Sequence, residues 1–167
     1  MTIPATLVRT SHSLSIQANG TIVGLINGWN PTQNRAATPI YEVDISSSGG
    51  PVEYMPGNVT GLNITINRYD IYNKRMEEAF GTRDLVMLHR QSEPFSVIEK
   101  WIIPERFGGG EERFIYDGCW FTSLGRTLRS DDNRIVNVNA TLVYVKKQKV
   151  TGLAAPSLSL PNLPRLA

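Results

Sequence analysis

The sequence contains few of the residues from which active sites and covalent cross-links are built. One cysteine and two histidines occur in 167 residues, so an internal disulfide bond is excluded. Neither His12 nor His89 has a partner at metal-ligand spacing, which favours structural roles for both. Cys119 stands among aromatic residues and is expected to be a buried thiol, because no local motif pairs it with a base. The sequence therefore predicts no catalytic residue, no metal site and no cofactor.

Charged residues and long apolar runs are also scarce. Asp, Glu, Lys and Arg make up 19% of the chain, a low share for a globular protein. This composition suits a protein whose surface is largely committed to neighbouring subunits, and it equally suits an ordinary β protein. No apolar run approaches the roughly 18 residues of a membrane helix, and no charged-then-apolar leader opens the chain. We expect no membrane segment and synthesis in the cytoplasm.

The few charges are unevenly distributed. Residues 1–132 carry 12 basic and 15 acidic side chains, a net charge of −3. Residues 133–167 carry five basic side chains and no acidic one, which accounts for the overall net charge of +2. A mildly acidic body argues against nucleic-acid binding through phosphate contacts.

Alternation of apolar and polar residues recurs along the chain and predicts a mainly β (α+β) protein. The strands are expected at residues 5–9, 12–18, 21–29, 40–45, 62–68, 95–103, 113–124 and 135–145. Asp70 stands where a helix N-cap would, and residues 71–80 read as one short helix ended by Gly81. Residues 84–89 fit a strand or a helix, and residues 30–37 are expected to form a polar loop.

The composition changes at Thr151. Three prolines exclude a regular helix or a central strand in residues 151–167, while five leucines make the segment too apolar for a solvated tail. We expect a β domain over residues 1–150 and an extended Pro/Leu-rich arm over residues 151–167. An apolar extended arm lies on its own domain or on a neighbour.

The order of features between residues 42 and 81 resembles the tail-tube proteins of contractile-tailed phages, tailocins and extracellular injection systems. The tube protein of type VI secretion is a more distant relative. The resemblance is carried by Glu42, by Gly49-Gly50 and Pro56-Gly57, by the strand at residues 63–68 and by the helix after it. It covers about a quarter of the chain well. The strand at residues 135–145 also stands where that family ends its fold.

The resemblance implies a structural protein rather than an enzyme. Its fold would be two packed antiparallel sheets, forming a sandwich or partial barrel with one short flanking helix. The subunits would form hexameric rings stacked into a tube of the virion tail, with a lumen that passes DNA or effectors. The tail sheath and the baseplate would be its partners. The alternatives are a tube-like baseplate or tail-terminator ring protein, and a β-sandwich binding module. Trp29, Trp101 and Trp120 fall in apolar strands, which favours a core over the exposed aromatic pocket of a binding module.

Strand alternation divides each predicted sheet into an apolar face and a polar face. The apolar sets, expected in the core, are Tyr41, Val43 and Ile45; Leu62, Ile64 and Ile66; and Val136, Val138, Ala140 and Leu142. On the resemblance, the opposite residues face the lumen: Glu42, Asp44, Asn63, Thr65 and Asn67, with Asn137, Asn139 and Thr141 as a further set. The same faces could instead meet solvent or a neighbour on the outside.

Contacts between subunits are expected at five other residues. They are Arg35 in the polar loop, Arg68 at a strand end, and Leu158, Leu160 and Leu163 in the arm. Arg68 also fits an ordinary surface charge.

Deletion of residues 153–167 should weaken assembly and spare the fold of the domain. Ordering a flexible arm costs roughly 1–2 kcal/mol per residue in backbone entropy. Burial of its leucines, at about 25 cal/mol per Å², must offset that loss against a neighbour. Sedimentation should show smaller oligomers with an unchanged circular dichroism spectrum. Full-size assembly of the truncated chain would contradict the prediction.

Overall fold

The computed structural model describes residue 9 and residues 14–24, 26–43, 48–72, 74–82, 85–128 and 135–152. Of residues 151 and 152 it describes the backbone alone. Strands dominate these residues, and the helical segments are short. The elements are β1 (Leu14–Ala18), β2 (Thr21–Ile22), β3 (Ile26–Ile40), β4 (Glu53–Tyr69), α1 (Met76–Ala79), the 3₁₀ turn η3 (Leu88–Arg90), β5 (Phe95–Ile102), the 3₁₀ turn η4 (Glu105–Phe107), β6 (Glu111–Thr127), β7 (Asn137–Val143) and β8 (Lys146–Gly152).

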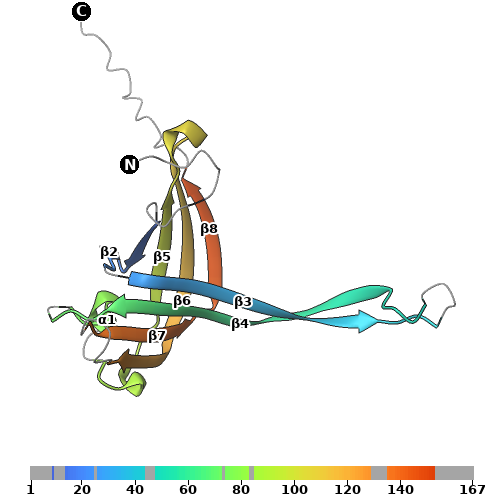
Figure 1. Cartoon of the computed structure of the whole chain (residues 1–167), viewed down its shortest axis with the longest axis horizontal. Helices are drawn as coiled ribbons and strands as arrows, with labels where there is room; N and C mark the ends of the chain where they lie inside the picture. The colour runs from blue at the N-terminus through green and yellow to red at the C-terminus, as the bar shows by residue number, and fades with distance from the viewer. Residues whose placement is uncertain are drawn as a thin grey trace, which may run out of the picture.

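Two antiparallel sheets share one strand, β6. The first half of β6 pairs with β5 and β8, and β5 pairs with β1, which pairs with β2. The second half of β6 pairs with β7, followed by β4 and β3. We call these the first and the second sheet. The strands of the first sheet run across those of the second (Figure 1). This arrangement confirms the predicted mainly β, sandwich-like fold.

The crossing is built around a glycine in the middle of β6. Gly118 has φ of +69°, and a Cβ atom at this position would lie 2.9 Å from Cγ2 of Val145. A second irregularity follows, because the pairing of β6 with β7 shifts register between Phe121 and Ser123. Bulges of this kind bend a strand and increase its twist. β6 therefore leaves one sheet and enters the other within a few residues.

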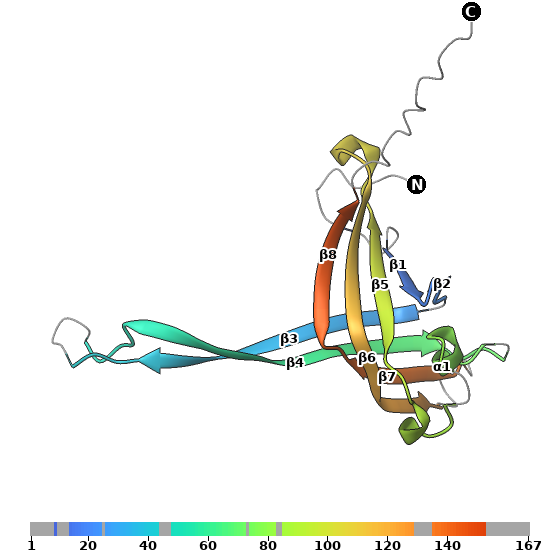
Figure 2. The ribbon, with the colours of Figure 1, turned by 180° about the vertical axis from the view of Figure 1, so that it is seen from behind.

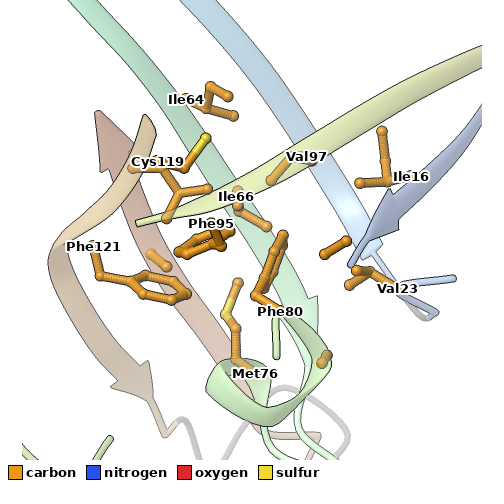
Figure 3. Close-up of a cluster of buried hydrophobic side chains, with 14 of the residues drawn as sticks. Ile16, Val23, Ile64, Ile66, Met76, Phe80, Phe95, Val97, Cys119 and Phe121 are labelled. Carbon is orange, nitrogen blue, oxygen red and sulfur yellow. The ribbon is translucent and has the colours of Figure 1, made fainter. Parts of the chain in front are cut away.

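The core fills the space where the two sheets cross, and α1 closes one end of it. Ile64 and Ile66 of β4 are fully buried, as the alternation predicts. Phe80, which follows α1, packs against Phe95 of β5 and Phe121 of β6 with ring centroids 5.7 and 5.8 Å apart. Figure 3 shows these rings together with Met76, Val97 and Cys119. The cluster joins both sheets and the helical turn in one apolar interior.

A buried carboxylate links the sheets a short distance from this cluster. Glu99 of β5 is 6% exposed and accepts three hydrogen bonds. Trp29 Nε1 of β3 and the Tyr116 hydroxyl of β6 donate to Oε2 at 3.1 and 2.7 Å, and Trp101 Nε1 donates to Oε1 at 2.7 Å. Burial and the bond to Glu99 raise the pKa of Tyr116. Because Trp29 belongs to the second sheet, Glu99 connects the two sheets through a single side chain.

The predicted loop at residues 30–37 is wrong, because these residues lie inside the long strand β3. Pro31 and the polar residues after it gave the segment its loop-like composition. β3 pairs only with β4 in the part of the chain that the structure describes. An edge strand tolerates proline because one side of it needs no donor.

The strand predicted at residues 40–45 is also wrong in its described part. β3 ends at Ile40, and Tyr41 and Val43 are 63% and 107% exposed, so they are not core residues. Asp44 and Ile45 lie outside the described residues. Apolar and polar residues do alternate here, but no second layer of described residues packs over this part of the chain.

A helix was predicted at residues 71–80, but the observed helix is much shorter: α1 spans Met76–Ala79. The Asp70 N–H does not begin a helix but donates to the carbonyl of Val136, which extends the pairing of β4 with β7. The Lys74 carbonyl accepts a hydrogen bond from the Arg68 side chain. Tertiary contacts thus occupy the groups that an earlier helical turn would use.

The strands predicted at residues 95–103 and 113–124 are confirmed as β5 and β6, with β6 longer at both ends. The strand predicted at residues 135–145 is confirmed as β7, and β8, which the sequence did not predict, follows it and returns along β6. Of the three tryptophans expected in the core, only Trp29 packs against it.

Glu99→Gln should lower the free energy of unfolding by about 1–3 kcal/mol, because the neutral amide accepts fewer and weaker hydrogen bonds from three buried donors. Urea unfolding followed by tryptophan fluorescence measures the change. Glu93→Gln, at an exposed position, is the matched control and should stay within about 0.5 kcal/mol. Equal stability of Glu99→Gln and the unaltered chain would contradict a structural role for this carboxylate.

Candidate assembly surfaces

The face of the second sheet that points away from the core carries no charged side chain among the described residues. We call it the amide–hydroxyl face. Its register follows from β4, where Ile64, Ile66 and Arg68 are buried and the residues between them point the other way. Cross-strand pairing and, for Asn27, a hydrogen bond to Asn137 then assign the members: Asn27, Gly28, Asn30 and Thr32 of β3; Asn63, Thr65, Asn67 and Tyr69 of β4; Asn137, Asn139, Thr141 and Val143 of β7; and Trp120, Ser123, Gly125 and Thr127 of β6.

Hydrogen bonds across the strands hold several of these polar side chains in place. Asn139 Nδ2 donates to Thr127 Oγ1 at 3.0 Å, and Asn27 Nδ2 donates to Asn137 Oδ1 at 3.3 Å. Thr32 Oγ1 donates to the backbone carbonyl of Asn63 at 3.4 Å. The face is therefore polar, uncharged and partly self-satisfied, which leaves it little affinity for either sign of charge.

The predicted lumen residues divide between two places. Asn63, Thr65 and Asn67 lie together on the amide–hydroxyl face, beside the polar residues of β7. Glu42 follows the end of β3 and is exposed far from that face, and Asp44 lies outside the described residues. The structure brings the amides together and separates Glu42 from them.

A two-stranded ribbon extends from the second sheet beyond the body of the protein. We call residues 34–43 and 48–60 the distal hairpin; among the described residues, its strands pair only with each other. Figures 1 and 2 both show it projecting past the crossing strands. Arg35 is exposed here, and its Nε donates to the Gly57 carbonyl at 3.0 Å. Large apolar side chains are at least half exposed on it: Tyr41, Val43, Val52, Tyr54, Met55 and Val59. An isolated ribbon with this surface is poorly stable in water without a partner.

Arg68 is not available to a neighbouring subunit. It is 1% exposed, and its Nε and Nη1 donate to the carbonyls of Gly24 and Lys74, both at 2.9 Å. Burial lowers the pKa of its guanidinium, while Asp70 and Glu77 oppose this shift. Both earlier interpretations, a surface charge and an inter-subunit ion pair, required an exposed side chain and are wrong. The three leucines of the arm lie outside the described residues.

The first sheet carries two groups of ion pairs. Glu111 pairs with Lys100 and Arg113, and hydrogen bonds from these two cations lower the pKa of its carboxyl. Glu112 pairs with Lys149 and Arg9, and the Lys149 hydrogen bond is the main reason why its pKa is lowered. Lys149 of β8 therefore neutralises an acid of β6. Sequence reasoning missed this pairing because it did not predict β8.

No chemistry-bearing cluster appears in the part of the chain that the structure describes. No three His, Cys, Asp or Glu side chains gather there at metal-binding distance. Burial raises the pKa of Cys119 to about 12, so the thiol is protonated at neutral pH. The indole N–H groups of Trp29 and Trp101 both donate hydrogen bonds to Glu99. Among the described residues, no helix combines the length and the apolar composition that crossing a membrane requires.

Solved structures share this fold over almost their full length. A chain of the anti-feeding prophage tube-terminating cap has a TM-score of 0.65 at 14% identity, covering 91% of this chain and 97% of the other. A chain of the sheath–tube complex of the PVC extracellular contractile injection system has a TM-score of 0.64 at 14% identity, covering 89% and 95%. A chain of the PVC sheath/tube terminator has a TM-score of 0.62 at 13% identity, covering 88% and 99%.

No protein-family model and no curated protein matches the chain. At this level of identity the solved structures demonstrate a common fold. The chain therefore shares the fold of tube and tube-cap components of contractile injection systems, which confirms the resemblance seen in its sequence.

Arg68→Met should lower the free energy of unfolding by about 2–4 kcal/mol, because the backbone carbonyls of Gly24 and Lys74 lose the hydrogen bonds of a buried charged donor. Denaturant unfolding of the subunit measures the effect. Arg113→Met removes an arginine whose side chain is 47% exposed and should change stability by less than about 0.5 kcal/mol. If Arg68→Met instead left stability intact and reduced oligomerisation alone, Arg68 would be an interface residue after all.

Proposed function

We propose that this chain is the structural subunit of a contractile-tail-type tube, assembled as stacked hexameric rings around a channel. The observation that carries the proposal is the fold match, which spans nearly the whole of this chain and of the tube-terminating cap and sheath–tube chains. A match over both full lengths leaves little room for a different architecture built around the same core. A baseplate chain of the anti-feeding prophage also matches, at a TM-score of 0.54.

The amide–hydroxyl face is the proposed channel wall, with Asn63, Thr65 and Asn67 in its centre. Cations on such a wall would bind the phosphates of a passing nucleic acid and release counterions, which would retard its movement. A wall of amides and hydroxyls offers no fixed charge to bind or to repel a polymer. Because Glu42 lies on the distal hairpin, we do not include it in the wall.

Lateral contacts are proposed along the open strand edges. Among the described residues, β3 pairs only with β4 and β8 pairs only with β6, so each has one edge without a strand partner. Pairing between neighbours in a ring would cover these edges and protect them from aggregation. The sheath and the baseplate are the proposed partners of the finished tube, a component of the particle's tail. Arg35 and the leucines at 158, 160 and 163 are proposed to contact neighbouring subunits.

Electron microscopy and sedimentation of the purified full-length protein test this function. We expect six-fold rings, and tubes once a baseplate or a preformed ring seeds growth. Rings that never elongate with a seed would favour the second candidate, a single-ring terminator or baseplate protein, which the similarity to the tube-terminating cap supports. Monomers at every concentration, with and without a seed, would overturn the proposal.

Replacement of Asn63 and Asn67 by lysine should slow the passage of nucleic acid through assembled tubes. Each ring would gain cations on its wall, and raising the salt concentration should partly restore the rate because it weakens phosphate binding. The measurement is genome release from particles whose tubes assemble normally, with Asn63→Gln and Asn67→Gln as the uncharged control. Unchanged release by the lysine variant would argue that these residues do not face the channel.

A further inference from the structure

The two sides of β6 are covered by neighbouring strands to different extents. On one side, β8 and then β7 pair with residues 111–117 and 120–127. On the other side, β5 pairs with β6 only as far as the contact of Phe95 with Cys119. Pro94 precedes Phe95 and has no N–H, so it cannot donate a further ladder bond to β6. Beyond Cys119, this side of β6 has no strand partner among the described residues.

The side chain of Gln91 occupies the beginning of this open edge. Its Nε2 donates to the Cys119 carbonyl at 3.2 Å, and its Oε1 accepts a hydrogen bond from the Phe121 N–H at 2.9 Å. The carbonyl of one residue and the N–H two residues later point to the same side of a strand, where a neighbouring strand would bond to both. The Gln91 carboxamide therefore offers β6 the donor and the acceptor that another strand would supply.

Gln91 is fixed in this position by further bonds. It is 9% exposed, and its Nε2 also donates to the Glu93 carbonyl at 3.1 Å. Its backbone N–H donates to the Leu88 carbonyl at 3.2 Å, which ties it to the η3 turn. With the amide reversed, its NH₂ group would face the N–H of Phe121, donor against donor, so the hydrogen bonds determine its orientation. The carboxamide is thus held against the backbone of β6.

The other strand edges carry features by which natural sheets avoid unwanted pairing. β3 contains two prolines, β8 contains three lysines, and β2 is only two residues long. Between Cys119 and Thr127, β6 contains no proline and no lysine, and Arg126 is its single charged residue. A bulge follows Phe121, directly after the contact with Gln91. Protection of this edge therefore depends on the bulge, on one charge and on the Gln91 side chain.

We propose that Gln91 guards the edge of β6 in the free subunit. Its carboxamide occupies the position that a strand of a second copy would take, and so prevents off-pathway strand addition at the bend. Without it, an open edge would run from Cys119 to Thr127, interrupted only by the bulge. An uncovered edge of this kind is a template for pairing with another chain. This role belongs to the subunit before assembly and does not depend on the proposed tube function.

Gln91→Met in the full-length protein tests the role, because methionine keeps the length of the side chain and lacks the carboxamide. The Phe121 N–H should exchange with solvent about tenfold faster, since it loses its hydrogen bond to Oε1. The free subunits should form aggregates that bind thioflavin T several-fold faster than the unaltered chain, and electron microscopy should show neither rings nor tubes in them. Gln148→Met is the matched control, because that amide donates to the Asp117 side chain rather than to strand backbone.

A destabilised variant separates edge opening from a general loss of stability. Val138→Ala removes methyl groups from a buried position of β7 and leaves the edge of β6 covered. Gln91→Met should aggregate faster than Val138→Ala at urea concentrations that give both variants the same free energy of unfolding. Equal rates, or unchanged exchange of the Phe121 N–H, would overturn the proposal.

Gln91→Glu provides a second reading if Gln91→Met does not fold. The carboxylate keeps an acceptor for the Phe121 N–H and places a charge at the edge, which opposes strand addition. This variant should aggregate no faster than the unaltered chain. If it aggregated faster than Val138→Ala at equal stability, Gln91 would have a packing role and not a guarding one.

Discussion

The whole architecture depends on a single strand that belongs to two sheets. β6 pairs with β5 and β8 before its bend and with β7 after it. The bend requires Gly118, because its positive φ and the close approach of Val145 leave no room for a side chain. Every other feature follows from the crossing that this bend creates: the position of the core, the direction of β4 and the side on which the distal hairpin emerges.

Buried polar side chains define this crossing more narrowly than apolar packing could. Apolar contacts are non-directional, so they tolerate small rotations of one sheet against the other. Glu99 requires Trp29 from one sheet and Tyr116 from the other at hydrogen-bonding distance. Arg68 likewise ties the end of β4 to the backbone at Gly24 and Lys74. A buried ionised group without its partners is strongly unfavourable, which disfavours alternative arrangements of the sheets.

The distribution of charge follows the two sheets. The ion pairs of Glu111 and Glu112 lie on the first sheet, whereas the amide–hydroxyl face of the second sheet carries no charge among its described residues. The distal hairpin carries a third kind of surface, with several large apolar side chains at least half exposed. One small domain therefore offers three chemically different surfaces, which suits a subunit that has different neighbours around it.

The sequence by itself determined which side chains of β4 and β7 share a face, because the two-residue period of a strand depends on local geometry alone. Ile64, Ile66, Val138 and Leu142 are buried as their alternation predicts. It also indicated β5, β6 and the buried Cys119. It could not show that residues 30–37, with Pro31, continue a strand, because proline is tolerated on an edge strand and the sequence alone does not reveal which strand lies at an edge. Tyr41 and Val43 alternate like core residues but have no second layer of described residues over them.

Arg68 looked like a surface charge, and only the folded chain brings the carbonyls of Gly24 and Lys74 within its reach. Burial, edges and long-range partners depend on where distant segments meet, and only the tertiary structure decided that.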